Sequence, residues 1–86
     1  MIEAITEDGP GLASRTIDTP KVFSGVGDFG GGTLSIERMN GNGGWQPIPK
    51  ASFTEDFEEI INFDRPTKTR RVMSGSTTPN VVFEGP

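Results

Sequence analysis

The amino-acid sequence predicts an all-β fold, a small antiparallel β-sandwich or barrel of about seven short strands. Three observations support this prediction. Apolar and polar residues alternate in several short segments, which is typical of strands with one buried face. Turn-forming Gly, Pro, Asn and Asp residues separate these segments at intervals of about 8–12 residues. No stretch combines helical periodicity with the capping residues of a useful helix.

The first part of the chain is expected to contain an irregular N-terminal arm followed by two short strands. Residues 1–11 carry three acids and end in Gly9-Pro10-Gly11, which predicts a flexible or irregular N-terminal arm before a single β domain over residues 12–86. A short strand is expected at 12–17. After a proline-containing turn, residues 21–26 form the next expected strand, with Val22 and Val26 on one face and Phe23 on the other.

The middle of the chain reads as a hairpin. Residues 33–39 alternate clearly, with Leu34 and Ile36 on one face. The loop 40–44 (NGNGG) consists of Asn and Gly, which tolerate the positive φ angles of tight turns. The strand expected at 45–49 contains Pro47 and Pro49, so it belongs at a sheet edge, because proline has no N–H for a ladder.

The last third predicts strands at 57–63, 68–74 and 80–84, separated by turn signals. A weaker alternative is a helix over Glu55–Ile61 with Thr54 as its cap. The residues expected in the core are Leu34, Ile36, Trp45, Ile48, Phe53, Ile61, Val72 and Phe83.

Composition limits both stability and function. A chain of 86 residues buries only about 60–65% of its unfolded surface, and small domains of this kind are usually supported by disulfides, metals or oligomerisation. With no Cys and no His, disulfides and His or thiolate metal sites are excluded, so we expect oligomerisation or docking on a larger assembly. No cofactor and no catalytic residue is expected, since nothing in the sequence forms a nucleophile–base arrangement.

The charge and hydropathy of the chain exclude several partners. A net charge of −4 argues against free nucleic acid as a ligand, because nucleic-acid binding depends on neutralising phosphates. No apolar run approaches the ~20 residues of a membrane helix, so no membrane is expected as a partner. The acidic N-terminal residues lack the pattern of a signal peptide, and we expect a protein that is made and used without secretion.

Several motif matches have simpler explanations. Residues 25–30 fit G-x-G-x-x-G, but more glycines and a strand follow where a nucleotide site needs a helix. Four acids lie within 55–59 and four bases within 65–71, and a hairpin of 57–63 with 68–74 would place them opposite one another. The same charges could instead pair between subunits. A carboxylate hydrolase built on these acids is a remote alternative.

Trp45 has two interpretations. It can be a packing or interface anchor, or a stacking platform of a glycan-binding module. A loss of glycan binding in Trp45→Ala without unfolding would favour the second.

About two-thirds of the chain resembles a type of small β-sandwich virion protein of tailed bacteriophages. The resemblance lies in the segment GDFGGGTLSIERMNGNGGWQPIPKASFT and in the later segment TRRVMSGSTTPNVVFEG. The shared features are a glycine-rich approach to an alternating strand, a Gly-rich turn before Trp, and a short strand of apolar residues and prolines. An arginine-containing strand, a Ser-Gly turn and a last apolar strand close the pattern. The acid-rich residues 55–59 depart from this pattern, where a neutral glycine-containing turn is expected.

The resemblance implies a non-enzymatic structural protein of the virion, made in the host cytoplasm. It favours a capsid decoration or cement protein that binds the major capsid protein or another virion protein as a homo-oligomer, with a trimer favoured by analogy. A tail or head-fibre component is the alternative. The residues expected at interfaces are Ile2, Ile5, Leu12, Trp45, Glu58, Glu59, Arg65, Arg70 and Arg71.

Overall fold

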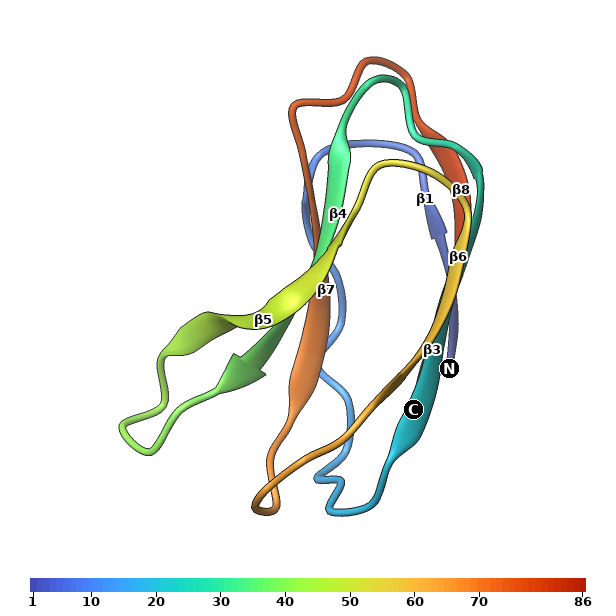
Figure 1. Cartoon of the computed structure of the whole chain (residues 1–86). Coiled ribbons are helices and arrows are strands. Elements are labelled where there is room, and N and C mark those ends of the chain that lie inside the picture. Colours follow the sequence, from blue (N-terminus) through green and yellow to red (C-terminus); the bar gives the residue numbers. More distant parts are fainter.

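The computed structural model describes all 86 residues and confirms the all-β prediction. Eight strands and no helix are present (Figure 1). The strands are β1 (Ile2–Ile5), β2 (Gly9–Pro10), β3 (Lys21–Asp28), β4 (Thr33–Met39), β5 (Trp45–Phe53), β6 (Phe57–Ile61), β7 (Thr69–Ser74) and β8 (Asn80–Glu84). They form two four-stranded antiparallel sheets, sheet A in the order β1-β8-β3-β6 and sheet B in the order β2-β7-β4-β5.

The strand pairing is nested. β1 pairs with β8, β2 with β7, β3 with β6 and β4 with β5, while β3–β8 and β4–β7 complete the two sheets. Only the β4–β5 hairpin joins neighbours in one sheet, and every other connection passes from one sheet to the other. Eight strands rolled up in this nested order form a jelly-roll sandwich.

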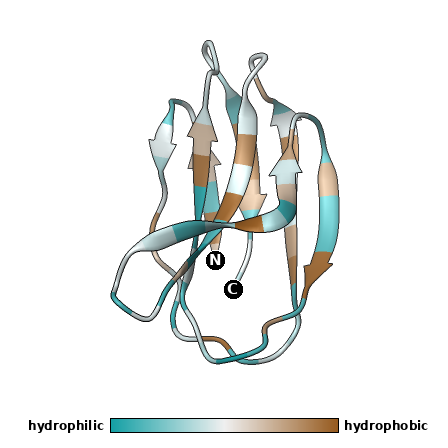
Figure 2. Cartoon of the chain, turned by 60° about the vertical axis from the view of Figure 1, so that its left-hand side comes forward, coloured by the Kyte–Doolittle hydropathy of each residue, from teal (hydrophilic) through white to brown (hydrophobic).

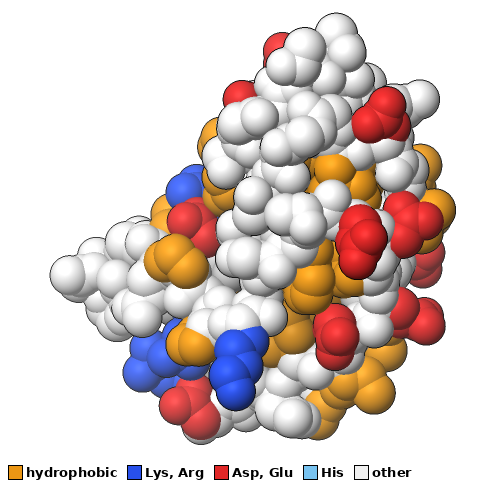
Figure 3. Space-filling view, turned by 45° about the horizontal axis from the view of Figure 1, so that its top comes forward, with side chains coloured by type: hydrophobic (Ala, Val, Ile, Leu, Met, Phe, Trp, Pro, Cys, Tyr) orange, Lys and Arg blue, Asp and Glu red, His pale blue; other side chains and the backbone are white.

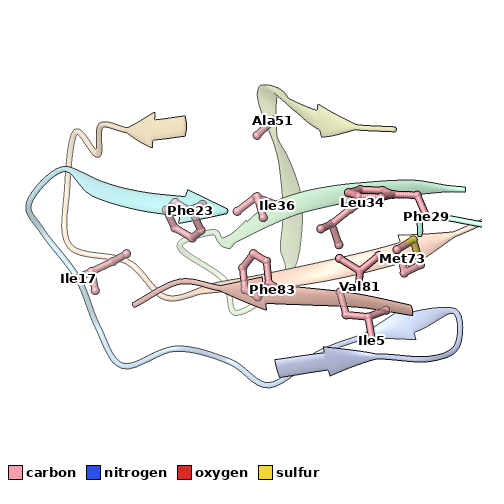
Figure 4. Close-up of a cluster of buried hydrophobic side chains, with 10 residues drawn as sticks. All are labelled: Ile5, Ile17, Phe23, Phe29, Leu34, Ile36, Ala51, Met73, Val81 and Phe83. Atoms are coloured by element: carbon pink, nitrogen blue, oxygen red, sulfur yellow. The ribbon is translucent and has the colours of Figure 1, made fainter. Parts of the chain in front are cut away.

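The core lies between the sheets and contains ten buried hydrophobic residues (Figure 4). Hydrophobic and hydrophilic residues alternate along the strands, so one face of each strand supplies this layer (Figure 2). Phe23 of β3 packs against Phe83 and Phe63, with both pairs of ring centroids 6.3 Å apart. The buried residues are Ile5, Ile17, Phe23, Phe29, Leu34, Ile36, Ala51, Met73, Val81 and Phe83.

Most of the expected strands are present. The strands predicted at 33–39 and 80–84 have the predicted bounds, and the Asn-Gly loop at 40–44 joins β4 to β5 as a hairpin. The strand predicted from residue 45 continues to Phe53, with a bulge in its pairing to β4 and a positive φ of 65° at Lys50. The helix considered for Glu55–Ile61 is wrong, because Phe57–Ile61 pairs with β3.

The prediction of an irregular arm over residues 1–11 is also wrong. Ile2–Ile5 is the edge strand of sheet A, and Ile5 is buried. Residues 12–17 form no regular strand. The segment runs beside β7 instead, where the N–H groups of Gly11, Ser14 and Ile17 donate to carbonyl groups of residues 71, 69 and 67.

The core prediction is partly correct. Leu34, Ile36 and Phe83 are buried, and Ile48, Phe53 and Ile61 are partly buried against the core. Val72 and Trp45 are not core residues. In β7, Arg71 and Met73 point inward, so Val72 between them points outward. Trp45 pairs with Met39 near the β4–β5 hairpin loop, which projects from the sandwich (Figure 1).

Candidate protein-binding face

The outer face of sheet A carries an unusual number of exposed aliphatic side chains. We call the outward side chains of Ile2, Val22, Val26, Ile60 and Val82 the aliphatic face. These five residues are 50–69% exposed, and they account for all but two of the large hydrophobic residues that the chain exposes. An isolated exposed aliphatic residue is ordinary, whereas a group of them on one face makes that face a candidate contact surface.

Strand register shows how this face is organised, because residues opposite each other in antiparallel strands point to the same side. Val82 of β8 lies between Ala4 and Val26, and Val22 of β3 lies opposite Ile60. The row between these two aliphatic rows runs from Ile2 through Glu84 and Ser24 to Glu58. The face therefore consists of two aliphatic rows on either side of a row that holds two carboxylates.

Charge is distributed unequally between the sheets. The outward positions of sheet A hold three acids, Asp28, Glu58 and Glu84, and no base. The strands of sheet B carry one acid, Glu37, and four bases, of which only Arg71 is buried. Figure 3 shows acidic side chains along the side of the molecule where sheet A lies, with hydrophobic side chains among them and basic side chains on the opposite side. The aliphatic face thus suits a partner surface that is apolar and basic.

The size of the aliphatic face limits its affinity. Four strands spaced ~4.8 Å apart and rows ~7 Å apart give an area of about 14 by 14 Å, or roughly 200 Å². A standard protein interface buries about 800 Å² on each partner. One copy of this face is therefore too small for firm binding by itself.

Two of the predicted interface residues lie inside the sandwich. Ile5 is a core residue, and Arg71 is buried at the edge where the chain crosses from β1 to β2. The Arg71 guanidinium lies 3.4 Å from the Glu3 carboxylate and also donates to the Gly9 carbonyl. Both side chains are 10% exposed, and Glu3 Oε1 and Arg71 Nε have no hydrogen-bond partner. This ion pair joins sheet A to sheet B.

Trp45 is half-buried on the outer side of sheet B. The Arg70 guanidinium lies 4.6 Å from the centre of its ring, and Arg70 Nε donates to the Glu37 carboxylate at 2.8 Å. One face of the indole is therefore covered by the Arg70 cation and is closed to a stacked sugar.

The acidic and basic clusters do not face each other as the hairpin interpretation expects. β6 belongs to sheet A and β7 to sheet B, because the connection between them crosses the sandwich. That expectation is wrong. Glu58 points outward, Glu59 lines a groove described below, and Arg65 is exposed in the β6–β7 connection. The acids do not converge on one site, and Asp56 Oδ1 accepts a hydrogen bond from the Gly27 N–H.

Two carboxyl groups outside the aliphatic face, those of Asp64 and Asp8, have lowered pKa values. A hydrogen bond from Arg38, together with its positive charge, lowers the pKa of Asp64, and their charged atoms are 3.0 Å apart. Hydrogen bonds from the Ser76 hydroxyl and N–H lower the pKa of Asp8. Both carboxyl groups are ionised at neutral pH and stabilise connections between strands.

A shallow groove runs along the open side of the sandwich between β5 and β6. Two adjoining hollows of about 380 and 320 Å³ share Ile48, Pro49 and Asn62. Lys50 and Glu59 lie along the same groove. Prolines on β5 and successive glutamates on β6 make these two strand edges poor templates for another strand.

The exposed part of this arrangement was only partly visible in the sequence. The shared face of Val22 and Val26 is predicted by alternation, and the adjacent apolar residues of Val81-Val82-Phe83 are the signal that β8 carries apolar residues on both faces.

No group of acidic residues is arranged to hold a metal ion, and no helix is long and apolar enough to cross a membrane. No protein-family model, curated protein or solved structure matches the chain.

Proposed function

We propose that this protein is a non-enzymatic structural component of a tailed-bacteriophage virion, and that it decorates the capsid by docking its aliphatic face on the major capsid protein or another virion protein. The observation that carries the proposal is the aliphatic face, which exposes five large aliphatic side chains on one sheet of a sandwich that already has a closed core. Exposed aliphatic side chains grouped on one face are removed from water when a partner protein covers them, which stabilises the assembly.

Two further arguments support a virion protein. Jelly-roll sandwiches occur in viral coat proteins, as well as in lectins and cupins, so the topology supports the proposal by analogy. The sequence resemblance to small phage virion proteins points in the same direction. A tail or head-fibre component would use the same face and differs only in its partner.

Binding through many copies is the proposed mechanism. Each aliphatic face offers roughly 200 Å² by the strand spacing, so each contact is weak. Many copies on a repeating shell add their contacts, and linked contacts bind more firmly than any single one. The protein would be made in the host cytoplasm and then remain on the particle.

Particles of the encoding phage test the proposal directly. Mass spectrometry and electron microscopy of purified particles should find the wild-type protein on the shell. Val82→Glu adds a carboxylate to the aliphatic row between Ala4 and Val26 and should remove the protein from particles. The matched control, Ser74→Glu, adds the same charge at an exposed position on sheet B and should leave occupancy unchanged.

Both variants should melt within a few degrees of the wild type, since neither residue is buried. Absence of the wild-type protein from purified heads and tails alike would refute the proposed function. Equal occupancy of all three proteins would refute the assignment of the face.

A further inference from the structure

The four edges of the two sheets differ in how well they are protected from pairing with another strand. β5 carries Pro47 and Pro49, and β2 is two residues long and contains Pro10. β6 carries consecutive glutamates. Prolines, charges and short length are the devices that keep sheet edges from pairing. β1 has no proline, and its one charge, Glu3, points inward to Arg71.

The free edge of β1 presents backbone groups in a defined pattern. The Met1 amino group donates to the Gly85 carbonyl at 2.6 Å, and the Gly85 N–H donates to the Met1 carbonyl at 3.0 Å. Hydrogen-bonded and non-hydrogen-bonded pairs alternate along an antiparallel ladder. The N–H and C=O groups of Ile2 and Ala4 therefore point away from β8, toward the free edge. No backbone hydrogen bond joins β1 to the neighbouring segment 9–17.

The side chains beside this edge are apolar. Ile2 and Leu12 are each 69% exposed, the highest values among the large hydrophobic residues of the chain. The Leu12 N–H donates to the Glu3 carboxylate, which places Leu12 next to β1. Ala4 is also exposed. The edge thus combines unpaired backbone groups with uncharged, apolar neighbours.

We infer that β1 pairs antiparallel with β1 of a second copy of this chain, which joins two sheets A into one eight-stranded sheet. A twofold pair must place inward side chains opposite inward ones, so its register is centred on a residue. The two central residues of β1 are Glu3 and Ala4. The Glu3 register brings two buried carboxylates face to face. The Ala4 register places two small side chains opposite each other and puts Ile2 opposite Thr6, with one more hydrogen-bonded pair than the Glu3 register.

The Ala4 register also explains why a second copy fits better than an unrelated strand. No exposed charge of β1 meets its own copy across the twofold axis, so the contact is self-complementary. The joined sheet carries two aliphatic faces on the same side, which doubles the contact area. A twofold pair replaces the threefold assembly expected by analogy. This inference does not rest on the proposed function, since its test uses the purified protein alone.

The oligomeric state in solution is the first test. Sedimentation equilibrium of the wild type should give twice the 9.2 kDa chain mass at high concentration. Ala4→Pro removes an N–H that points to the free edge and leaves the β1–β8 hydrogen bonds in place. It should give a folded monomer, with the circular dichroism spectrum of the wild type. A monomeric or trimeric wild type, or a dimeric Ala4→Pro variant, would overturn the inference.

Crosslinking tests the register without relying on the proline variant. The chain has no cysteine, so Ala4→Cys introduces a single thiol. A hydrogen-bonded pair has a Cα separation of about 5.5 Å, within the range of a disulfide. Mild oxidation should convert most of this variant to a covalent dimer. The control Ile60→Cys, exposed on the opposite edge strand, should stay largely monomeric. Equal crosslinking of the two variants would contradict the β1 pairing.

Discussion

Replacing Arg71 with methionine should lower the free energy of unfolding of this fold by about 3–5 kcal/mol. The guanidinium is 10% exposed and lies 3.4 Å from a Glu3 carboxylate that is equally buried. Arg71→Met leaves that carboxylate with a single hydrogen bond, from the Leu12 N–H at 3.3 Å. Removal of one partner of a buried ion pair costs about 3–5 kcal/mol, because the other charge remains in a poorly solvated site. A chain of this size has a free energy of unfolding of roughly 4–13 kcal/mol.

The double variant Glu3→Met/Arg71→Met separates this effect from lost packing. Both charges are then absent, and side chains of similar length fill the site, so most of the loss should be recovered. The hydrogen bond to the Gly9 carbonyl is still missing, which leaves a deficit of about 1 kcal/mol. Urea titrations followed by circular dichroism measure all three proteins. The reasoning fails if Arg71→Met costs less than about 1 kcal/mol, or if the double variant is as unstable as the single one.

Three further predictions concern single contacts. Gly27→Ala should lower the free energy of unfolding by at least about 2 kcal/mol, because φ at Gly27 is 139° and an added Cβ would collide with the Asn80 carbonyl of β8. The control Gly41→Ala lies in an open loop and should be tolerated. Equal melting temperatures of the two variants would contradict this prediction. The lowered pKa of Asp64 means that its pairing with Arg38 stabilises the fold above the ordinary value of 3.8 and is lost as pH falls through the lowered value. Thermal melts should therefore show Asp64→Asn less stable than wild type at neutral pH and equal to it in strong acid, and a pH-independent difference would argue against the pairing. Arg70→Ala should uncover the single tryptophan, with a red-shifted emission and stronger acrylamide quenching, and an unchanged spectrum would show that the cation does not cover the ring.

Alternation predicted the strands where charge and hydropathy agree. In residues 33–39 both buried positions, Leu34 and Ile36, are apolar and are separated by a polar residue. The Asn-Gly loop that follows specifies the hairpin. β1 was missed because one of its two inward positions, beside the core residue Ile5, is Glu3, and a glutamate is expected to be exposed unless its partner is known. Val72 was assigned to the wrong face for the same reason, since Arg71 next to it points inward. The buried Glu3–Arg71 ion pair therefore explains why the inward faces of both β1 and β7 were predicted wrongly.

The aliphatic face could be predicted from the sequence only in part. Alternation shows that Val22 and Val26 share a face, but it does not show which face of a strand with apolar residues on both sides is covered. That depends on which strands become neighbours. The pairing of acids with bases across 57–74 failed for a related reason, because a sequence shows a turn near Pro66 without showing that the chain changes sheets there.

The nested pairing has a consequence for how the chain folds. The central β4–β5 hairpin is the one pair of strands that forms between sequence neighbours, so it is the natural nucleus. Each later pair closes a longer loop, and β1 reaches its partner across almost the whole chain. A topology so rich in distant pairings folds on a millisecond-to-second scale rather than in microseconds. During synthesis on the ribosome, β1 must wait for β8, and its unprotected edge stays available to other strands throughout that interval.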